Sequence, residues 1–236
     1  MTIQRRDSFL DNLAAQLGRK RKTEGVERPD WSIKPQYQVL KDATQDELVG
    51  VLEKQCEEIH TDFVRTDKKG LADVLQEAVE KYQAKSIVTA GGERVAEFGL
   101  DSIYRKLSEN GTAIHYWDEA NGEKNKKFAE KADIGITFSD ITLAESGTVT
   151  LFNDKYNGRA ISLLPKSYIA IIPKSTLVPR LTQATESIHR ENNRGDPVSS
   201  CVSFVTGPSN SADIEMKLIV GVHGPVAATY IVVDDL

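Results

Sequence analysis

Two short segments of the chain concentrate the residue types that carry out chemistry. In the first, Glu145 and Ser146 stand between an apolar stretch and Gly147. A carboxylate shielded by apolar neighbours can act as a nucleophile or as a general base. Glu145 is therefore a candidate catalytic residue and Ser146 a candidate ligand-binding residue. The alternative is that Glu145 caps a turn or faces solvent.

The second segment, GPSNSADIEMKLIVGVHGP, spans residues 207–225 and contains two glycine–proline turns. Glycine permits positive φ and proline fixes φ, so these turns indicate a specific backbone geometry. We expect a helix to begin at Asn210, with Asp213 and Glu215 in its first turn. Its N–H groups and nearby hydroxyls then form an anion cradle, or Asn210 simply caps the helix. The candidate ligand-binding residues of this segment are Gly207, Ser209, Asn210 and Ser211.

His223 belongs to the same segment, directly before the Gly224-Pro225 turn. A histidine at this position can bind a carboxylate substrate or transfer a proton near neutral pH, which makes it a candidate catalytic residue. Equally, it can donate to a backbone carbonyl and hold the turn. The other histidines have no comparable context, and none has metal-ligand spacing, so we expect no metal site.

Gly91 and Gly92 follow a predicted strand and are the remaining candidate ligand-binding residues. Paired glycines at a strand end let the backbone approach a phosphate or carboxylate. The full GxGxxG or Walker spacing is missing, so the pair does not indicate a nucleotide site. An ordinary strand-to-helix turn is the alternative interpretation.

Composition excludes several classes of protein. The 236 residues carry a net charge of −5, which argues against general affinity for nucleic acid or anionic membranes. No apolar run approaches the roughly 20 residues that span a bilayer, and the N-terminus lacks a signal-peptide core, so we expect a cytoplasmic protein. Two cysteines, Cys56 and Cys201, are too few for an iron–sulfur cluster, which normally needs four thiolates.

We predict two parts: an N-terminal arm over residues 1–40 and a domain over residues 41–236. Thr2 caps an amphipathic helix in the arm, which Gly18 ends, and a charged, glycine- and proline-containing linker follows. The helix must bury its leucines on its own core or on another subunit, so a homo-oligomer is one expected assembly.

From Thr44 onward, predicted strands and helices alternate, which indicates an α/β fold with a parallel or mixed sheet covered by helices. Thr44 and Glu47 form a capping-box pattern for a helix that continues to about His60. The segment 139–147 is predicted as a loop or short helix. The predicted strands cover 61–66, 86–90, 112–117, 133–138, 147–152, 168–173, 202–207 and 228–235. The further predicted helices cover 71–83, 100–110, 124–132 and 175–192.

Ligands of open α/β sheets bind outside the carboxyl ends of the strands. Polar loops at 89–94, 139–147 and 206–213 each follow a predicted strand. We therefore expect the three loops to converge on one rim, where Glu145, Ser209 and His223 share one concave pocket.

The motifs AESGTVTL, LLPKSYIAIIP and GPSNSADIEMKLIVGVHGP resemble those of the LUD-domain family, and the resemblance covers nearly everything after the arm. It implies a three-layer α/β/α sandwich with a mostly parallel sheet, similar to the sugar-phosphate isomerase/CoA transferase-like fold. This agrees with the alternating pattern of elements.

The resemblance also implies a subunit of a system that oxidises L-lactate to pyruvate. Two partner proteins would carry the iron–sulfur clusters. This chain lacks the cluster cysteines and a flavin or nicotinamide fingerprint, so we expect it to bind no cofactor of its own. Its rim would bind a small carboxylate such as lactate, an intermediate or the partner proteins. Two other hypotheses remain open. One is a stand-alone enzyme for a small phosphate or CoA ester, with Glu145 as nucleophile or base. The other is a non-catalytic binding or scaffold protein.

Overall fold

The computed structural model describes residues 4–25, 27, 31–195, 199–213 and 215–236, and the chain divides into two compact units, 1–38 and 39–236. The first unit contains α1 (Arg6–Gln16) and the short 3-10 helix η1 (Pro35–Tyr37). Arg21 folds back onto α1, where its guanidinium pairs with Asp7 at 2.7 Å and with Asp11 at 3.2 Å. The arm helix is therefore confirmed, whereas its predicted cap, Thr2, lies outside the described residues.

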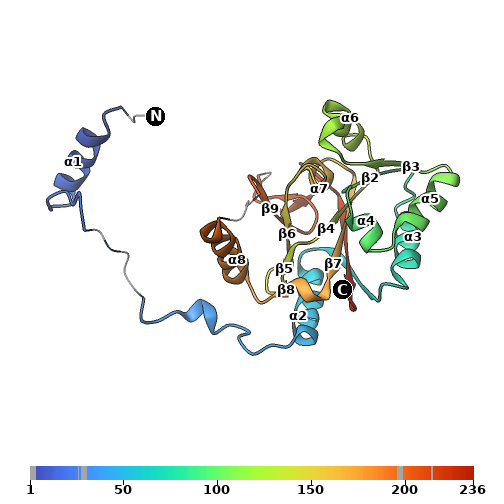
Figure 1. Cartoon of the computed structure of the whole chain (residues 1–236), viewed down its shortest axis with the longest axis horizontal. Coiled ribbons are helices and arrows are strands. Elements are labelled where there is room, and N and C mark those ends of the chain that lie inside the picture. Colours follow the sequence, from blue (N-terminus) through green and yellow to red (C-terminus); the bar gives the residue numbers. More distant parts are fainter. Residues whose placement is uncertain (1–3, 26, 28–30, 196–198, 214) are drawn as a thin grey trace. The chain divides into compact units, whose positions relative to one another are not determined.

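The second unit is built on a six-stranded sheet in which every neighbouring pair is parallel (Figure 1). Apolar β12 and β7 are interior strands, as expected for the run YIAIIP, because interior strands of a parallel sheet are covered on both faces. In spatial order the strands are β1 (Thr61–Thr66), β12 (Ala227–Val233), β7 (Ser167–Pro173), β4 (Ile134–Phe138), β2 (Ser86–Thr89) and β3 (Ala113–Tyr116).

Alternation along the central strands divides the core between the two faces of this sheet. Ile169 and Ile171 of β7 join the cluster formed with α3 (Leu71–Lys81), α4 (Arg94–Glu97) and α5 (Asp101–Glu109). Tyr168 and Ile172 join the opposite cluster, which contains α2 (Gln45–Glu58). The short helices α6 (Glu123–Ala129) and α7 (Ala160–Leu163) pack on β2 and β4 respectively. The layered α/β architecture with a parallel sheet is confirmed.

A second, four-stranded sheet is the main departure from the sequence prediction. Its order is β8 (Leu177–Val178), β5 (Ile141–Leu143), β6 (Thr148–Phe152) and β9 (Val202–Thr206). The segment 139–147 thus contains a strand instead of forming a loop or short helix. The strand at 202–207 pairs antiparallel with β6 and does not complete the main sheet. Its alternating sequence, VSFVT, suits an antiparallel sheet with one exposed face better than a buried parallel one.

Two predicted helices are also corrected. The helix predicted over 175–192 begins later, as α8 (Leu181–Arg194), because β8 occupies the preceding residues after the 3-10 helix η3 (Lys174–Thr176). Pro179, which would stand in the first turn of the predicted helix, therefore precedes the observed one. No helix begins at Asn210 among the described residues of that segment: β10 (Asn210–Ser211) pairs antiparallel with β11 (Ile219–Val220) in a hairpin. Positive φ values at Glu215 and Met216 are incompatible with a helix there.

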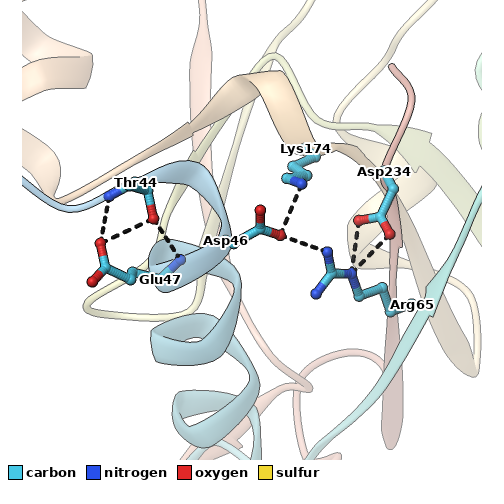
Figure 2. Close-up of polar contacts among 6 residues, drawn as sticks. All are labelled: Thr44, Asp46, Glu47, Arg65, Lys174 and Asp234. Atoms are coloured by element: carbon cyan, nitrogen blue, oxygen red, sulfur yellow. Dashed lines mark hydrogen bonds and ion pairs between the residues drawn. The ribbon is translucent and has the colours of Figure 1, made fainter.

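The N-terminus of α2 has the capping box that the sequence predicts. The Thr44 hydroxyl accepts the backbone N–H of Glu47 at 3.3 Å, and the Glu47 carboxylate accepts the backbone N–H of Thr44 at 2.7 Å (Figure 2). Two helix-end donors are thereby satisfied, which starts the helix at Gln45.

A network of ion pairs then links α2 to the carboxyl ends of three neighbouring strands. Asp46 accepts from Lys174, just after β7, at 2.9 Å and from Arg65 of β1 at 2.6 Å (Figure 2). Arg65 also donates to Asp234, just after β12, at 2.7 Å. The Lys174 ammonium, followed by the Arg65 guanidinium, holds the pKa of Asp46 below its ordinary value. The network therefore joins three strands and one helix at this edge.

At the amino edge of the main sheet, Asp133 also links neighbouring strands. Its carboxylate accepts from the backbone N–H groups of Lys85 and Ser86 at 2.9 and 3.1 Å, and from the Lys166 ammonium at 2.8 Å. Partial burial raises the pKa of Asp133, but Lys166 and the donors before β2 outweigh burial and leave the pKa below the ordinary 3.8. Asp133 thus links the starts of β2, β4 and β7.

Replacing this carboxylate tests the linkage. We expect Asp133→Asn to lower the free energy of unfolding by about 2 kcal/mol at pH 7, since charge-assisted hydrogen bonds are lost. A depressed folded-state pKa contributes stability that is present above the unfolded pKa and lost as pH falls through the folded one. The difference between wild type and variant should therefore shrink in urea titrations at acidic pH.

Asp42→Asn, at an exposed position, is the matched control and should have little effect. A constant difference between Asp133→Asn and wild type from pH 7 to strongly acidic pH would contradict the role of the Asp133 charge.

Candidate functional site

The candidate residues do not converge on one rim, because the structure places them at opposite edges of the main sheet. Gly91 and Gly92 follow β2, at the carboxyl edge. The loop after β9 lies at the amino edge: Gly207 approaches Ile59, directly before β1, and Val226 donates to the Lys166 carbonyl, directly before β7, at 2.8 Å. The predicted convergence is wrong because it assumed that β9 belongs to the parallel sheet.

The carboxyl-edge hollow has a volume of about 880 Å³ and contains both glycines. Gly91 lies so close to the backbone of Trp117 that an added Cβ would stand 2.4 Å from its carbonyl oxygen. The N–H of Gly91 already donates to the carbonyl of Tyr156 at 2.9 Å. Glycine is needed here for close packing, and this N–H is not available to a ligand.

Charge argues against an anion in the carboxyl-edge hollow. Arg94 forms an ion pair with Asp140, which also accepts the backbone N–H of Phe152 at 2.7 Å. The lining includes five carboxylates and two cationic side chains, so the hollow carries a net negative charge. A carboxylate or phosphate entering it would be repelled. The charged lining residues are Glu93, Glu97, Asp140, Asp154, Glu191, Arg94 and Lys155.

A smaller hollow of about 280 Å³ lies at the amino edge, and we call it the amino-edge hollow. It brings together four candidates, Gly207, Ser209, Asn210 and His223, with the turn Gly224-Pro225. The Ser209 hydroxyl accepts the backbone N–H of His223 at 3.2 Å, so it is the main chain of His223 that holds the turn, and its imidazole is exposed. Apart from His223, the lining has no titratable side chain.

Ser211 does not line the amino-edge hollow. Its hydroxyl donates to the Asp213 carboxylate at 2.8 Å, and the Asp213 backbone N–H returns to it at 3.2 Å. Short polar side chains that satisfy neighbouring backbone groups compete with helix formation. These contacts give a local reason for the turn found where a helix was predicted.

Glu145 and Ser146 line an adjoining hollow of about 560 Å³, which shares Phe204 and Thr206 with the amino-edge hollow. The Glu145 carboxylate forms an ion pair with Arg180 at 2.8 Å. Glu145 and His223 thus line neighbouring hollows and do not share one. Arg180 was not anticipated, because nothing in the sequence connects it with a residue 35 positions earlier.

A row of hydroxyls runs between the two adjoining hollows. Thr148 is 2.7 Å from Ser146 on one side and 2.7 Å from Thr206 of β9 on the other. The sequence offered one signal for it, since the alternation in GTVTLF places Thr148 on the same face as Thr150. The partner strand could not be identified from that pattern.

One buried hydroxyl joins both turns to the main sheet. Tyr230 of β12 accepts the backbone N–H of Gly207 at 2.8 Å and donates toward the carbonyl of Gly147 at 3.0 Å. Both glycines have positive φ, and an added Cβ would stand within 2.7 Å of Ile59 atoms in each case. Burial, followed by the nearby Tyr168, raises the pKa of Tyr230 well above its ordinary value. The phenol therefore stays protonated and keeps both bonds.

Two properties of the described part of the chain bear on metals and membranes. Its histidine, cysteine and acidic side chains form no group of three or more suited to hold a metal ion. None of its helices combines the length and the apolar character needed to cross a bilayer.

Known proteins are similar to this chain in sequence over nearly its whole length. A family model described as the LUD domain matches residues 49–233. A protein of Oceanobacillus iheyensis named "Lactate utilization protein C" is 64% identical over 99% of this chain and 100% of its own length. Proteins of the same name from Shouchella clausii and Bacillus subtilis are 54% and 51% identical, each over 99% of this chain and 99% and 98% of their own lengths.

The fold is also found in a solved structure. A DUF162 family protein from Deinococcus radiodurans superposes with a TM-score of 0.56 at 18% identity, over 81% of this chain and 99% of its own. At this identity the likeness concerns the α/β architecture.

Removing the Tyr230 hydroxyl tests its role in holding the two turns. Tyr230→Phe should lower the free energy of unfolding by about 2 kcal/mol, because it leaves the buried N–H of Gly207 without an acceptor. The amide of Gly207 should also exchange faster with deuterium. In the control Tyr104→Phe, Thr89 keeps its bond to the Ala90 carbonyl, and we expect a loss of about 1 kcal/mol or less. Equal losses with unchanged exchange at Gly207 would contradict this role.

Proposed function

This chain belongs to the LUD domain family, and from that premise we propose that it acts in lactate utilisation, as a subunit of a system that oxidises L-lactate to pyruvate. The observation that carries the proposal is the 64% identity, over nearly the whole chain, to a relative named "Lactate utilization protein C". The family match covers residues 49–233, whereas that likeness includes the arm as well. A shared arm and domain support a shared role.

Charge decides which hollow should take the substrate. Lactate is a small monoanion, which the five carboxylates of the carboxyl-edge hollow would repel. The amino-edge hollow has no carboxylate in its lining and offers polar donors from Ser209, Asn210 and His223. Its volume of about 280 Å³ lies just below the range of about 300–1,000 Å³ that is typical of ligand pockets. We therefore assign the small-carboxylate site to the amino-edge hollow.

In this proposal the side chains of the amino-edge hollow bind and orient the substrate. The Asn210 amide and the imidazole of His223 hold the carboxylate, and the imidazole can also take up a proton. Oxidation of lactate to pyruvate releases two electrons and two protons. The electrons would pass to iron–sulfur clusters in two partner proteins, while this chain binds no cofactor.

The geometry gives less support to a stand-alone esterase-like enzyme. That function would require Glu145 as a nucleophile or base, and the carboxylate is engaged by the Arg180 guanidinium at 2.8 Å. The ion pair must break before this carboxylate can attack a substrate or take up its proton. A non-catalytic scaffold is distinguished by direct binding, because its rim would bind no small molecule.

We also propose a cytoplasmic location. Both cysteines are free thiols, as is usual in a reducing compartment. Cys56 is buried in the core, and its burial raises the pKa of the thiol to about 12, so it stays protonated and unreactive.

Reconstitution tests the role of the whole chain. Lactate oxidation by the two iron–sulfur partners should depend on this protein and should be restored when the purified full chain is added back. If the partners oxidise lactate at the same rate without it, the proposed role is wrong.

Direct binding tests the site separately. In calorimetric titrations with L-lactate, His223→Ala should weaken binding by about tenfold, since a charge-assisted hydrogen bond is worth about 1.5–3 kcal/mol. The control His189→Ala removes an exposed histidine on α8 and should leave binding unchanged. Equal affinities of wild type and His223→Ala would remove His223 from the site without affecting the reconstitution result.

A further inference from the structure

The carboxyl-edge hollow, which the proposed function leaves unused, contains carboxylates without a cationic partner. Glu93 directly precedes α4 and Glu97 is its last residue, and neither carboxylate forms a hydrogen bond or ion pair with a residue that the structure describes. Like charges four positions apart on a helix repel each other. Arg94 lies between them in sequence, but its guanidinium is held by Asp140 and by the carbonyl of Phe138 at 3.1 Å. These two carboxylates are therefore free to pair with a cation from outside.

A buried amide oxygen in the same wall also lacks a donor. Asn157 lines the hollow and is only 7% exposed, and its Oδ1 atom has no hydrogen-bond partner in the described part of the chain. Backbone bonds of 3.2 and 3.3 Å between Asp154 and Asn157 fix the turn that carries this side chain. A buried acceptor without a donor is costly, so a ligand that brings an N–H group is favoured here.

Several donors of the lining are already engaged within the protein. The Asn153 amide donates to the carbonyl of Asn157 at 3.0 Å, and the Ser199 hydroxyl donates to the carbonyl of Asn153 at 2.5 Å. The N–H of Gly91 donates to Tyr156 at 2.9 Å. A suitable ligand therefore supplies donors and positive charge. An ammonium group has three N–H donors and no acceptor.

The spacing of the acidic groups favours an organic cation over a metal ion. Among the described residues, no three acidic, histidine or cysteine side chains form a group suited to hold one ion. A flexible chain with several ammonium groups can reach carboxylates that a single ion cannot join. The lining already accommodates one ammonium, since the Nζ atom of Lys155 lies 4.8 Å from the ring centroid of Tyr156.

Size and surface character favour a small molecule over a protein partner. The volume of about 880 Å³ falls within the range of about 300–1,000 Å³ that is typical of ligand pockets. None of the large, exposed apolar side chains of the described chain belongs to this lining. Protein–protein interfaces are depleted of charge at their core, whereas charged groups dominate this hollow.

We propose that the carboxyl-edge hollow binds a small organic polycation of the diamine or polyamine class. Glu93 and Glu97 pair with its ammonium groups, and the ring of Tyr156 faces a further one. The site lies at the opposite edge of the main sheet from the amino-edge hollow. Its test is therefore independent of lactate binding.

Calorimetric titration of the full chain with spermidine, a linear chain with three amino groups, tests the proposal. Low ionic strength is used because salt screens exposed charges. Wild type should bind spermidine saturably, and n-butylamine, which has one ammonium group, should bind at least about tenfold more weakly. Glu93→Gln/Glu97→Gln should weaken spermidine binding at least about tenfold, because two charged acceptors are lost.

Glu57→Gln/Glu58→Gln is the matched control. It removes two exposed carboxylates at the end of α2 and changes the net charge by the same amount. This variant should bind spermidine as wild type does, and thermal melting should show that both double variants remain folded.

Backbone amide shifts followed by NMR during the spermidine titration locate the ligand. They should centre on Gly91, Gly92 and Asn157. Shifts centred elsewhere, or no saturable binding to wild type, would overturn the proposal. Equal affinities of wild type and the Glu93→Gln/Glu97→Gln variant, or equal losses in both double variants, would overturn it as well. So would Mg²⁺ that binds this hollow as tightly as spermidine.

Discussion

The geometry of the amino edge depends on one buried hydroxyl. Tyr230 reaches from the central strand β12 to the turns at Gly147 and Gly207, which begin β6 and follow β9. These turns connect the second sheet to the first strand of the main sheet, and both require a glycine with positive φ. With the two turns fixed, the Ser209 loop and His223 take defined positions beside α7. The amino-edge hollow is therefore a consequence of how the two sheets are joined.

Electrostatics distinguishes the two edges of the main sheet. The carboxyl edge, where open α/β sheets usually bind ligands, holds the charge network of Asp46 and a hollow lined by more acidic than basic groups. The amino edge offers hydroxyls, an amide and an imidazole without carboxylates in the hollow. A small anion therefore has an electrostatic reason to bind at the less usual edge.

Local sequence patterns correctly predicted the elements that interactions between neighbouring residues determine. Thr44 and Glu47 form the expected capping box, and the uninterrupted apolar run of β7 takes a central place in a parallel sheet. The predictions were wrong where pairing with a strand distant in sequence determines the structure. β9 joins β6 because its alternating residues need one exposed face, and β8 displaces the start of α8 by pairing with β5. The position of the Ser209 loop depends on β9. Because β9 was assigned to the wrong sheet, this loop was predicted at the wrong edge of the main sheet.

The central claim is that a small carboxylate binds at the amino edge and not at the carboxyl edge. Backbone amide chemical shifts of the full chain, followed by NMR during a titration with L-lactate, test it residue by residue. The account predicts that shifts concentrate on Ser209, Asn210 and His223, with Gly91 and Gly92 unchanged. Shifts centred on Gly91 and Gly92, or no saturable shifts at the amino edge, would contradict it.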